Sequence, residues 1–145
     1  MQSKLIYEDG KRTFALVFDE GDEAIAGIEK LAEEHNLHAA HLTAIGAFRK
    51  ATLGYFDYGK KDYTRIPVDG QVEVLSFIGN VSRYKGRPKV HVHVVLGRSD
   101  GSTLGGHLLE ADVRPTLEVV VTEEPGYLRR TVDETTGLPL LNLQT

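Results

Sequence analysis

Three histidines in the second half of the chain have the spacing of a metal site. His91 and His93 stand two residues apart in the run KVHVHVVLG, and His107 follows after a loop. Side chains two residues apart share one face of a β-strand, so the first two imidazoles point the same way. The dipeptide Asp100-Gly101 is typical of a hairpin turn, which brings His107 back on the neighbouring strand. Three imidazoles converging from adjacent strands suit zinc or another divalent metal ion.

Two interpretations of these histidines are open from the residues alone. They form one metal site, or they are separate strand histidines, each satisfied by its own hydrogen bonds. In the first case three protein ligands leave a fourth position for water or substrate, which is typical of a catalytic zinc site. A metal-bound water that attacks a carbonyl or phosphoryl group needs a general base nearby. The candidate carboxylates are Glu73, Glu110 and Asp100. Glu73 is preferred because an acidic residue is unusual inside the apolar run VEVLS; an outward-facing strand glutamate is the alternative.

Charge is unevenly distributed along the chain. The net charge is −4, which counts against general nucleic-acid binding. No acidic residue lies between Glu73 and Asp100, and that segment carries Arg83, Lys85, Arg87, Lys89 and Arg98. The segment is either a solvated strand edge or a surface that faces an anion. Within it, Arg98 is the candidate for holding an anionic substrate, or equally a carboxylate of a neighbouring subunit.

The surrounding pattern predicts the elements that position these residues. Apolar residues recur at helical spacing from Ala24 to Ala32, which predicts one amphipathic helix, capped by Asp22 and ending near His35. The other elements are short runs rich in β-formers: Leu5–Tyr7, Thr13–Phe18, His38–Phe48, Ala51–Tyr58, Tyr63–Ile66 ended by Pro67, Val72–Val81, Leu117–Thr122 and Tyr127–Val132. Many strands with one early helix predict an α+β fold, a mostly antiparallel sheet with the helix packed on it.

Composition sets the outer limits of the prediction. A length of 145 residues predicts a single compact domain over 1–145. The absence of cysteine excludes disulfides, thiolate ligands and a cysteine nucleophile. The first twelve residues lack the apolar core of a signal peptide, and no apolar run approaches the ~18 residues that span a bilayer, so we expect a cytoplasmic protein without a membrane partner. The tail LPLLNL is too apolar for a solvated terminus and is expected to pack on its own domain or on a neighbouring subunit.

Four ordered motifs carry a resemblance to a known family. They are HLTAIGAFRKATLGYFD (His41–Asp57), GQVEVLSFIGNVS (Gly70–Ser82), GRPKVHVHVVLGRSDG (Gly86–Gly101) and GGHLLEADVRPTLEVVV (Gly105–Val121). Together they cover nearly the whole chain and resemble the plants-and-prokaryotes-conserved, or PPC, domain family. The ordered set is far more specific than any one motif.

The resemblance implies a fold, an assembly and a ligand set. PPC domains are similar in having an antiparallel sheet of about seven strands and in forming homotrimers. Several members carry a metal on the histidines that correspond to His91, His93 and His107. In plants the domain follows AT-hook motifs in DNA-associated complexes, and stand-alone prokaryotic members have long been labelled predicted DNA-binding proteins.

Two segments of this sequence bear on whether the family's partner-binding and DNA-associated roles carry over to it. The segment Gly70–Leu75 (GQVEVL) differs from the family's Gly-Arg-Phe-Glu-Ile-Leu-like element at its second and third positions, which puts a partner-binding role for that element in doubt. The segment Lys85–Lys89 (KGRPK) resembles the core of an AT-hook. It falls between two predicted strands, however, where glycine and proline are expected to shape a turn.

Three hypotheses for function follow. The favoured one is a metal-binding homotrimer whose three-histidine site binds or transforms a small anionic ligand, with the reaction left open. The second is a DNA-associated regulatory or scaffolding protein that uses a basic surface formed by Arg83–Lys89 and Arg98. The third is a purely structural assembly domain whose metal only stiffens the fold.

Overall fold

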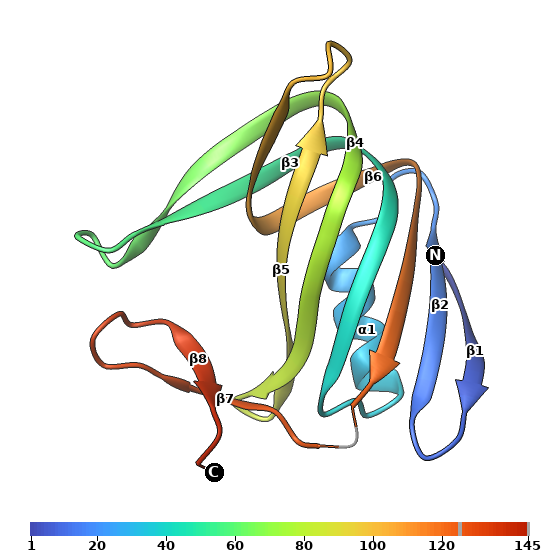
Figure 1. Cartoon of the computed structure of the whole chain (residues 1–145), viewed down its shortest axis with the longest axis vertical. Coiled ribbons are helices and arrows are strands. Elements are labelled where there is room, and N and C mark those ends of the chain that lie inside the picture. Colours follow the sequence, from blue (N-terminus) through green and yellow to red (C-terminus); the bar gives the residue numbers. More distant parts are fainter. Residues whose placement is uncertain (125, 145) are drawn as a thin grey trace.

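A computed structural model describes residues 1–124 and 126–144, which form eight strands and one helix (Figure 1). The elements are β1 (Gln2–Glu8), β2 (Arg12–Phe18), α1 (Ala24–Glu34), β3 (Ala40–Asp57), β4 (Asp62–Tyr84), β5 (Arg87–Gly97), β6 (Thr103–Glu123), β7 (Arg129–Val132) and β8 (Pro139–Asn142). The predicted single helix on a large sheet is confirmed. The sheet has eight strands rather than about seven, and it is mixed because β7 runs parallel to β4.

The sheet closes on itself around four of its strands. Its order is β1-β2-β6-β3-β4-β7-β8, and β5 pairs with both β4 and β6. Because β3 also pairs with both β4 and β6, these four strands form a closed circuit. Three of them are long, with 18 residues in β3, 23 in β4 and 21 in β6, so each can pair with different neighbours at its two ends. The predicted histidine hairpin is the β5–β6 part of this circuit.

Helix α1 lies behind the sheet and buries one face against it (Figure 1). The buried face consists of Ala24, Ile28, Leu31 and Ala32, as its helical spacing predicts. The N-cap is Glu23 rather than the predicted Asp22: one carboxylate oxygen of Glu23 accepts from Ala26 N at 2.6 Å, and the other accepts from Ala111 N at 2.9 Å. The Glu23 side chain therefore ties the start of the helix to β6.

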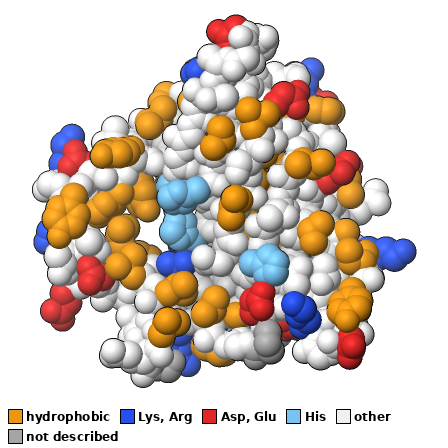
Figure 2. Space-filling model, in the orientation of Figure 1, with side chains coloured by type: hydrophobic (Ala, Val, Ile, Leu, Met, Phe, Trp, Pro, Cys, Tyr) orange, Lys and Arg blue, Asp and Glu red, His pale blue; other side chains and the backbone are white. Residues whose placement is uncertain are grey.

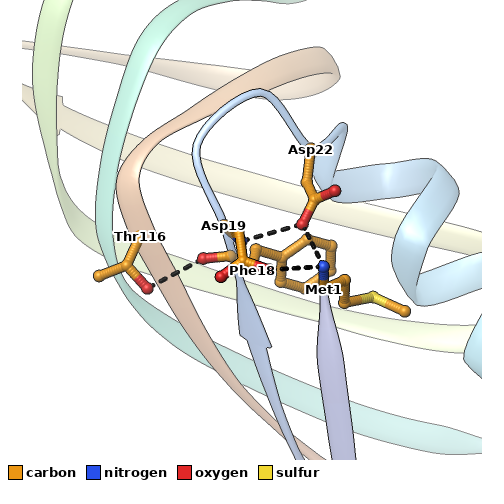
Figure 3. Close-up of polar contacts among 5 residues, drawn as sticks. All are labelled: Met1, Phe18, Asp19, Asp22 and Thr116. Carbon is orange, nitrogen blue, oxygen red and sulfur yellow. Dashed lines mark hydrogen bonds and ion pairs between the residues drawn. The ribbon is translucent and has the colours of Figure 1, made fainter.

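Asp22 has a different role, at the start of the chain (Figure 3). The N-terminal ammonium of Met1 lies 2.7 Å from the carboxylate of Asp22 and 2.9 Å from that of Asp19. Nearby, the hydroxyl of Thr116 donates to the carbonyl oxygen of Phe18 at 3.0 Å, which joins β6 to the end of β2. These contacts hold the edge strand β1 and the loop before α1 against the sheet.

Two hairpins project from the sheet on the same side of the molecule (Figure 1). The first is the outer part of β3 and β4, and the second is β7–β8. The sequence predicts separate strands over His38–Phe48 and Ala51–Tyr58, and a strand that ends at Pro67. Both predictions are wrong, because β3 and β4 continue through these positions. Pro67 lies where β4 pairs only with β3, so β4 is an edge strand there, a position at which proline is tolerated. No helix in the described part of the chain is long and apolar enough to cross a membrane.

Candidate metal site

The structure brings the three predicted histidines together on β5 and β6. His93 pairs directly with His107 across the two strands, and His91 lies two residues before His93 on the same face. Their candidate ligand nitrogens all lie within 4.8 Å of one another. Figure 2 shows pale-blue histidine side chains gathered at the margin of a hollow in the surface. We refer to His91, His93 and His107 as the histidine triad.

The donor set of the triad fits a divalent metal ion. The Nε2 atoms of His91 and His93 are 3.2 Å apart. Two nitrogens bound to one tetrahedral zinc ion at ordinary Zn–N distances are separated by about 3.3 Å, so this pair already has the required spacing. The Nδ1 atom of His107 is buried and has no hydrogen-bond partner. A buried polar atom is rarely left unsatisfied, so His107 is not a packed strand histidine of the ordinary kind.

Two imidazoles of the triad are held in the neutral form that binds metals. Burial lowers the pKa of His91 to about 4, and the positive charge of Arg130 acts in the same direction. Burial likewise lowers the pKa of His107 to about 4, with smaller contributions from the other two histidines. A metal ligand must have a free nitrogen lone pair. Neither imidazole therefore needs to lose a proton at neutral pH before it can bind an ion.

A cavity of about 200 Å³ lies against the triad, between the two projecting hairpins. The ring of Tyr63, from the outer part of β4, stacks on His107 with ring centroids 4.8 Å apart. We call this space the triad cavity; its lining residues are Tyr63, Lys89, Val90, His91, His107, Leu109, Arg130, Leu138, Pro139 and Leu140. Part of the apolar C-terminal tail thus packs on its own domain, while Leu143 remains exposed.

A comparison with protein families matches residues 6–125 to the Plants and Prokaryotes Conserved (PCC) domain, the family named above as PPC. The chain belongs to this family. The resemblance inferred from the motifs is therefore confirmed, and the matched segment contains the whole triad.

Solved structures of PPC-like proteins share the fold closely. A metal-containing protein from Archaeoglobus fulgidus is 41% identical, with 98% of this chain and 99% of that chain covered and a TM-score of 0.85. A PPC protein from Pyrococcus horikoshii is 35% identical over 90% of this chain and 91% of that chain, with a TM-score of 0.86. A candidate DNA-binding protein from Ralstonia eutropha JMP134 is 29% identical over 90% of each chain, with a TM-score of 0.84.

One curated relative is much longer than this PPC chain. The bifunctional protein GlmU of Synechococcus sp. (strain JA-2-3B'a(2-13)) is 29% identical over 127 residues, which are 86% of this chain. The chain spans about a fifth of that protein's length (19%). The match therefore concerns one region of a larger protein.

The structure does not bring the predicted Glu73 to the triad of this PPC domain. Glu73 is exposed on β4 and pairs with Gly97, which lies four residues beyond His93, or about 13 Å along β5. The other two candidate bases are also occupied elsewhere: Glu110 pairs with Arg65, and the Asp100 carboxylate accepts from the backbone and hydroxyl of Ser102. No carboxylate of the described residues lines the triad cavity.

The predicted anion-binding residue Arg98 also lies away from the triad. It follows β5 directly after Gly97, five residues beyond His93, and its backbone shapes the turn into β6. It is also separated from the basic β4–β5 turn by the full length of β5, about 35 Å, so the expected surface of Arg83–Lys89 with Arg98 is not continuous within one chain. Arg83 is largely buried, pairs with Glu33 and donates to Gly86 O.

Sequence reasoning missed two residues that complete the site, Tyr63 and Arg130. Arg130 is only 6% exposed, and its NH2 group lies 3.3 Å from Nδ1 of His91. In the sequence it is one of two adjacent arginines, and strand alternation says that one of the pair points inward without saying which. The sequence predicts a short strand at Tyr63, and nothing in its local pattern indicates that its ring reaches His107 across β3.

Proposed function

We propose that this chain is a metal-binding PPC protein whose histidine triad holds one divalent ion, with zinc as the first candidate. The observation that carries the proposal is the convergence of three imidazoles, with a 3.2 Å spacing of two Nε2 atoms and an unsatisfied Nδ1 on the third. It is supported by the 41% identical protein from Archaeoglobus fulgidus, which is described as metal-containing.

Three histidine ligands would leave a coordination position open for a small anionic molecule. A bound divalent ion would supply Lewis acidity, which polarises a carbonyl or phosphoryl oxygen. The chain's own residues supply the rest: Tyr63 fixes the ring of His107 by stacking, and the apolar residues of the cavity exclude water from one side of the triad. Because no described carboxylate lines the cavity, the geometry favours ligand binding over a reaction that needs a general base from the protein.

Metal analysis of protein purified without an affinity tag tests the proposal. We expect about one zinc ion or other divalent ion per chain, and loss of that metal in His107→Ala. His41→Ala is the matched control, because it removes an exposed histidine outside the triad. Full metal occupancy in the His107→Ala protein would refute the ligand assignment. In the wild-type protein, the visible absorption spectrum after cobalt substitution would report whether the bound ion is four-coordinate.

We further propose that the chain assembles as a homotrimer through the sheet face that carries the triad. This face exposes large apolar side chains on four strands: Val17 on β2, Ile45 on β3, Ile78 on β4 and Val120 on β6. Ile45 and Ile78 are 65% and 64% exposed, and Ile78 pairs directly with His93. Apolar patches of this kind mark interaction sites. Light scattering is expected to give three chains per particle, and Ile45→Glu is expected to yield monomers if the face is the interface.

DNA association is the second candidate function, favoured by the basic β4–β5 turn and by the candidate DNA-binding protein among the relatives. Lys85, Arg87 and Lys89 are exposed there. Arg129 lies beside the turn, because its backbone on β7 is the strand partner of Arg83 on β4. The resemblance to an AT-hook does not extend to its setting, because these residues join two paired strands. Salt-dependent binding that weakens in Arg87→Glu would support this function. A gel shift without retardation at low salt would exclude it.

A further inference from the structure

Arg130 is a buried cation that no carboxylate of the described residues neutralises. Its guanidinium donates to Ser82 Oγ at 2.7 Å, Asn80 Oδ1 at 2.9 Å and Pro139 O at 2.9 Å, and its NH2 group lies 3.3 Å from His91 Nδ1. None of these four partners carries a negative charge. By contrast, five arginines that are each more exposed than Arg130 form ion pairs with carboxylates: Arg12, Arg49, Arg65, Arg83 and Arg114. Buried charges in proteins are normally paired with an opposite charge. Arg130 is more buried than the five paired arginines, and it has no carboxylate partner among the described residues.

The side of the triad that faces Arg130 also lacks a hydrogen-bond acceptor. A histidine that binds a metal through one nitrogen usually donates its other N–H to a carboxylate, a carbonyl or water. In His91, Nε2 is the atom that faces His93, so Nδ1 is the atom that needs an acceptor. It meets Arg130 instead, and a guanidinium has no acceptor to offer.

The triad cavity has the size and the lining for the missing group. An engineered cavity of ~150 Å³ holds a benzene molecule, so a volume of about 200 Å³ suits roughly six to ten non-hydrogen atoms. Arg130 and Lys89 supply positive charge, and Leu109, Leu138 and Tyr63 supply apolar surface. The two oxygens of a carboxylate match one guanidinium, whereas the additional oxygens of a phosphate would meet mainly apolar side chains.

We propose that the triad cavity is a receptor for a small carboxylate with an apolar body. The carboxylate binds the guanidinium of Arg130 and accepts a hydrogen bond from Nδ1–H of His91. The apolar body packs against Leu109, Leu138 and Tyr63. The proposal deepens the proposed function, because it names the class of anionic ligand. It rests on that function only for the coupling between the carboxylate and a bound metal ion.

Calorimetric titration of chelator-treated and zinc-loaded protein with benzoate, benzamide and acetate tests this receptor. Benzoate is expected to bind both forms, and more tightly to the loaded form. Acetate is expected to bind more weakly because it lacks the apolar body. Benzamide has the same shape without the charge and is expected not to bind. Equal binding of benzamide and benzoate would overturn the proposal.

Variants separate recognition by Arg130 from recognition by the ion. His93→Ala removes a triad residue that does not line the cavity, so it is expected to abolish metal uptake while benzoate still binds. Arg130→Gln is expected to weaken benzoate binding roughly 10- to 100-fold, the usual effect of losing a hydrogen bond to a charged group. Arg129→Gln makes the same charge change at the preceding, exposed position and is the matched control. Unchanged benzoate affinity in a folded Arg130→Gln protein would overturn the proposal.

Leu109→Ala gives an independent test if Arg130→Gln does not fold. It enlarges the apolar part of the cavity and leaves the guanidinium in place, so benzoate binding is expected to weaken severalfold while acetate binding stays constant. Equal losses for the two ligands would contradict the assignment of the apolar body. Metal uptake without benzoate binding would refute the receptor and leave the proposed function standing, whereas benzoate binding without metal uptake would do the reverse.

Discussion

The metal-free PPC protein is expected to lose stability steeply between pH 6.5 and about 4 because of its triad. Burial lowers the pKa values of His91 and His107 from 6.5 to about 4 in the folded chain. In the unfolded chain both imidazoles regain ordinary pKa values and bind protons below pH 6.5. The unfolded state therefore binds more protons throughout this window, so the free energy of unfolding falls as the pH falls. Above pH 6.5 the imidazoles of His91 and His107 are neutral in both the folded and the unfolded chain, so their contribution to stability no longer changes with pH.

The size of the effect follows from the two shifts. Lowering each pKa from 6.5 to about 4 corresponds to at most about 3 kcal/mol of unfolding free energy across the whole window. With two such groups, the slope near pH 5 reaches at most about 2.7 kcal/mol per pH unit. A domain of this size is typically stable by ~5–15 kcal/mol, so the triad alone accounts for a large share of acid unfolding.

Guanidinium unfolding in the presence of a chelator, at intervals from pH 7.5 to 4.5, measures this slope. His107→Gln is expected to remove about half of it, because one of the two shifted imidazoles is gone. His41→Gln removes an exposed histidine outside the triad and serves as the comparison for substitutions of histidine in general. The reasoning is refuted if wild type and His107→Gln share one slope over the window.

Two further substitutions test the parts of the fold that hold the site. Gly79→Ala would place a Cβ in steric clash with the carbonyl oxygen of His91, so we expect a loss of about 1–3 kcal/mol in unfolding free energy together with weaker metal binding. Gly126→Ala, where a Cβ meets nothing, is its control, and equal effects of the two would contradict the clash. Glu123→Gln breaks the two-pronged contact of that carboxylate with Arg12, at 2.7 Å from both Nε and NH2, and should cost about 1–3 kcal/mol without changing metal content. Metal loss in this variant would show that the pair does more than join β2 to β6.

The triad was predictable because every relation that creates it is local. Alternation along one strand puts His91 and His93 on one face, and a short hairpin connects that strand to the one that carries His107. The helix was predictable for the same reason, since its apolar spacing is contained in eleven residues. Its cap was not, because Glu23 is fixed by the backbone of Ala111, far along the chain.

The rest of the site could not be read from the sequence because it depends on pairings between distant segments. Arg130 reaches His91 only because β7 joins the edge of β4, 46 residues earlier by the pairing of Arg83 with Arg129. An acidic residue in an apolar run makes Glu73 a candidate in the sequence, yet its register opposite Gly97 places it at the end of β5 away from the triad. Local pattern identifies the face of a strand on which a residue lies, and the register of long strands decides which residues meet.

The closed circuit of strands explains why a glycine pair precedes His107. At this point β6 has neighbours on both sides, β5 through His93 and β3 through Gly54. A Cβ on Gly105 would lie 2.7 Å from the carbonyl oxygen of Val94, so a side chain there would push β6 away from β5. Such a shift would separate His107 from His93, because the two are direct partners in that ladder. The Gly-Gly-His motif therefore belongs to the candidate metal site as much as the imidazoles do. The third histidine reaches the other two because the glycines before it let β6 pass close to its neighbours.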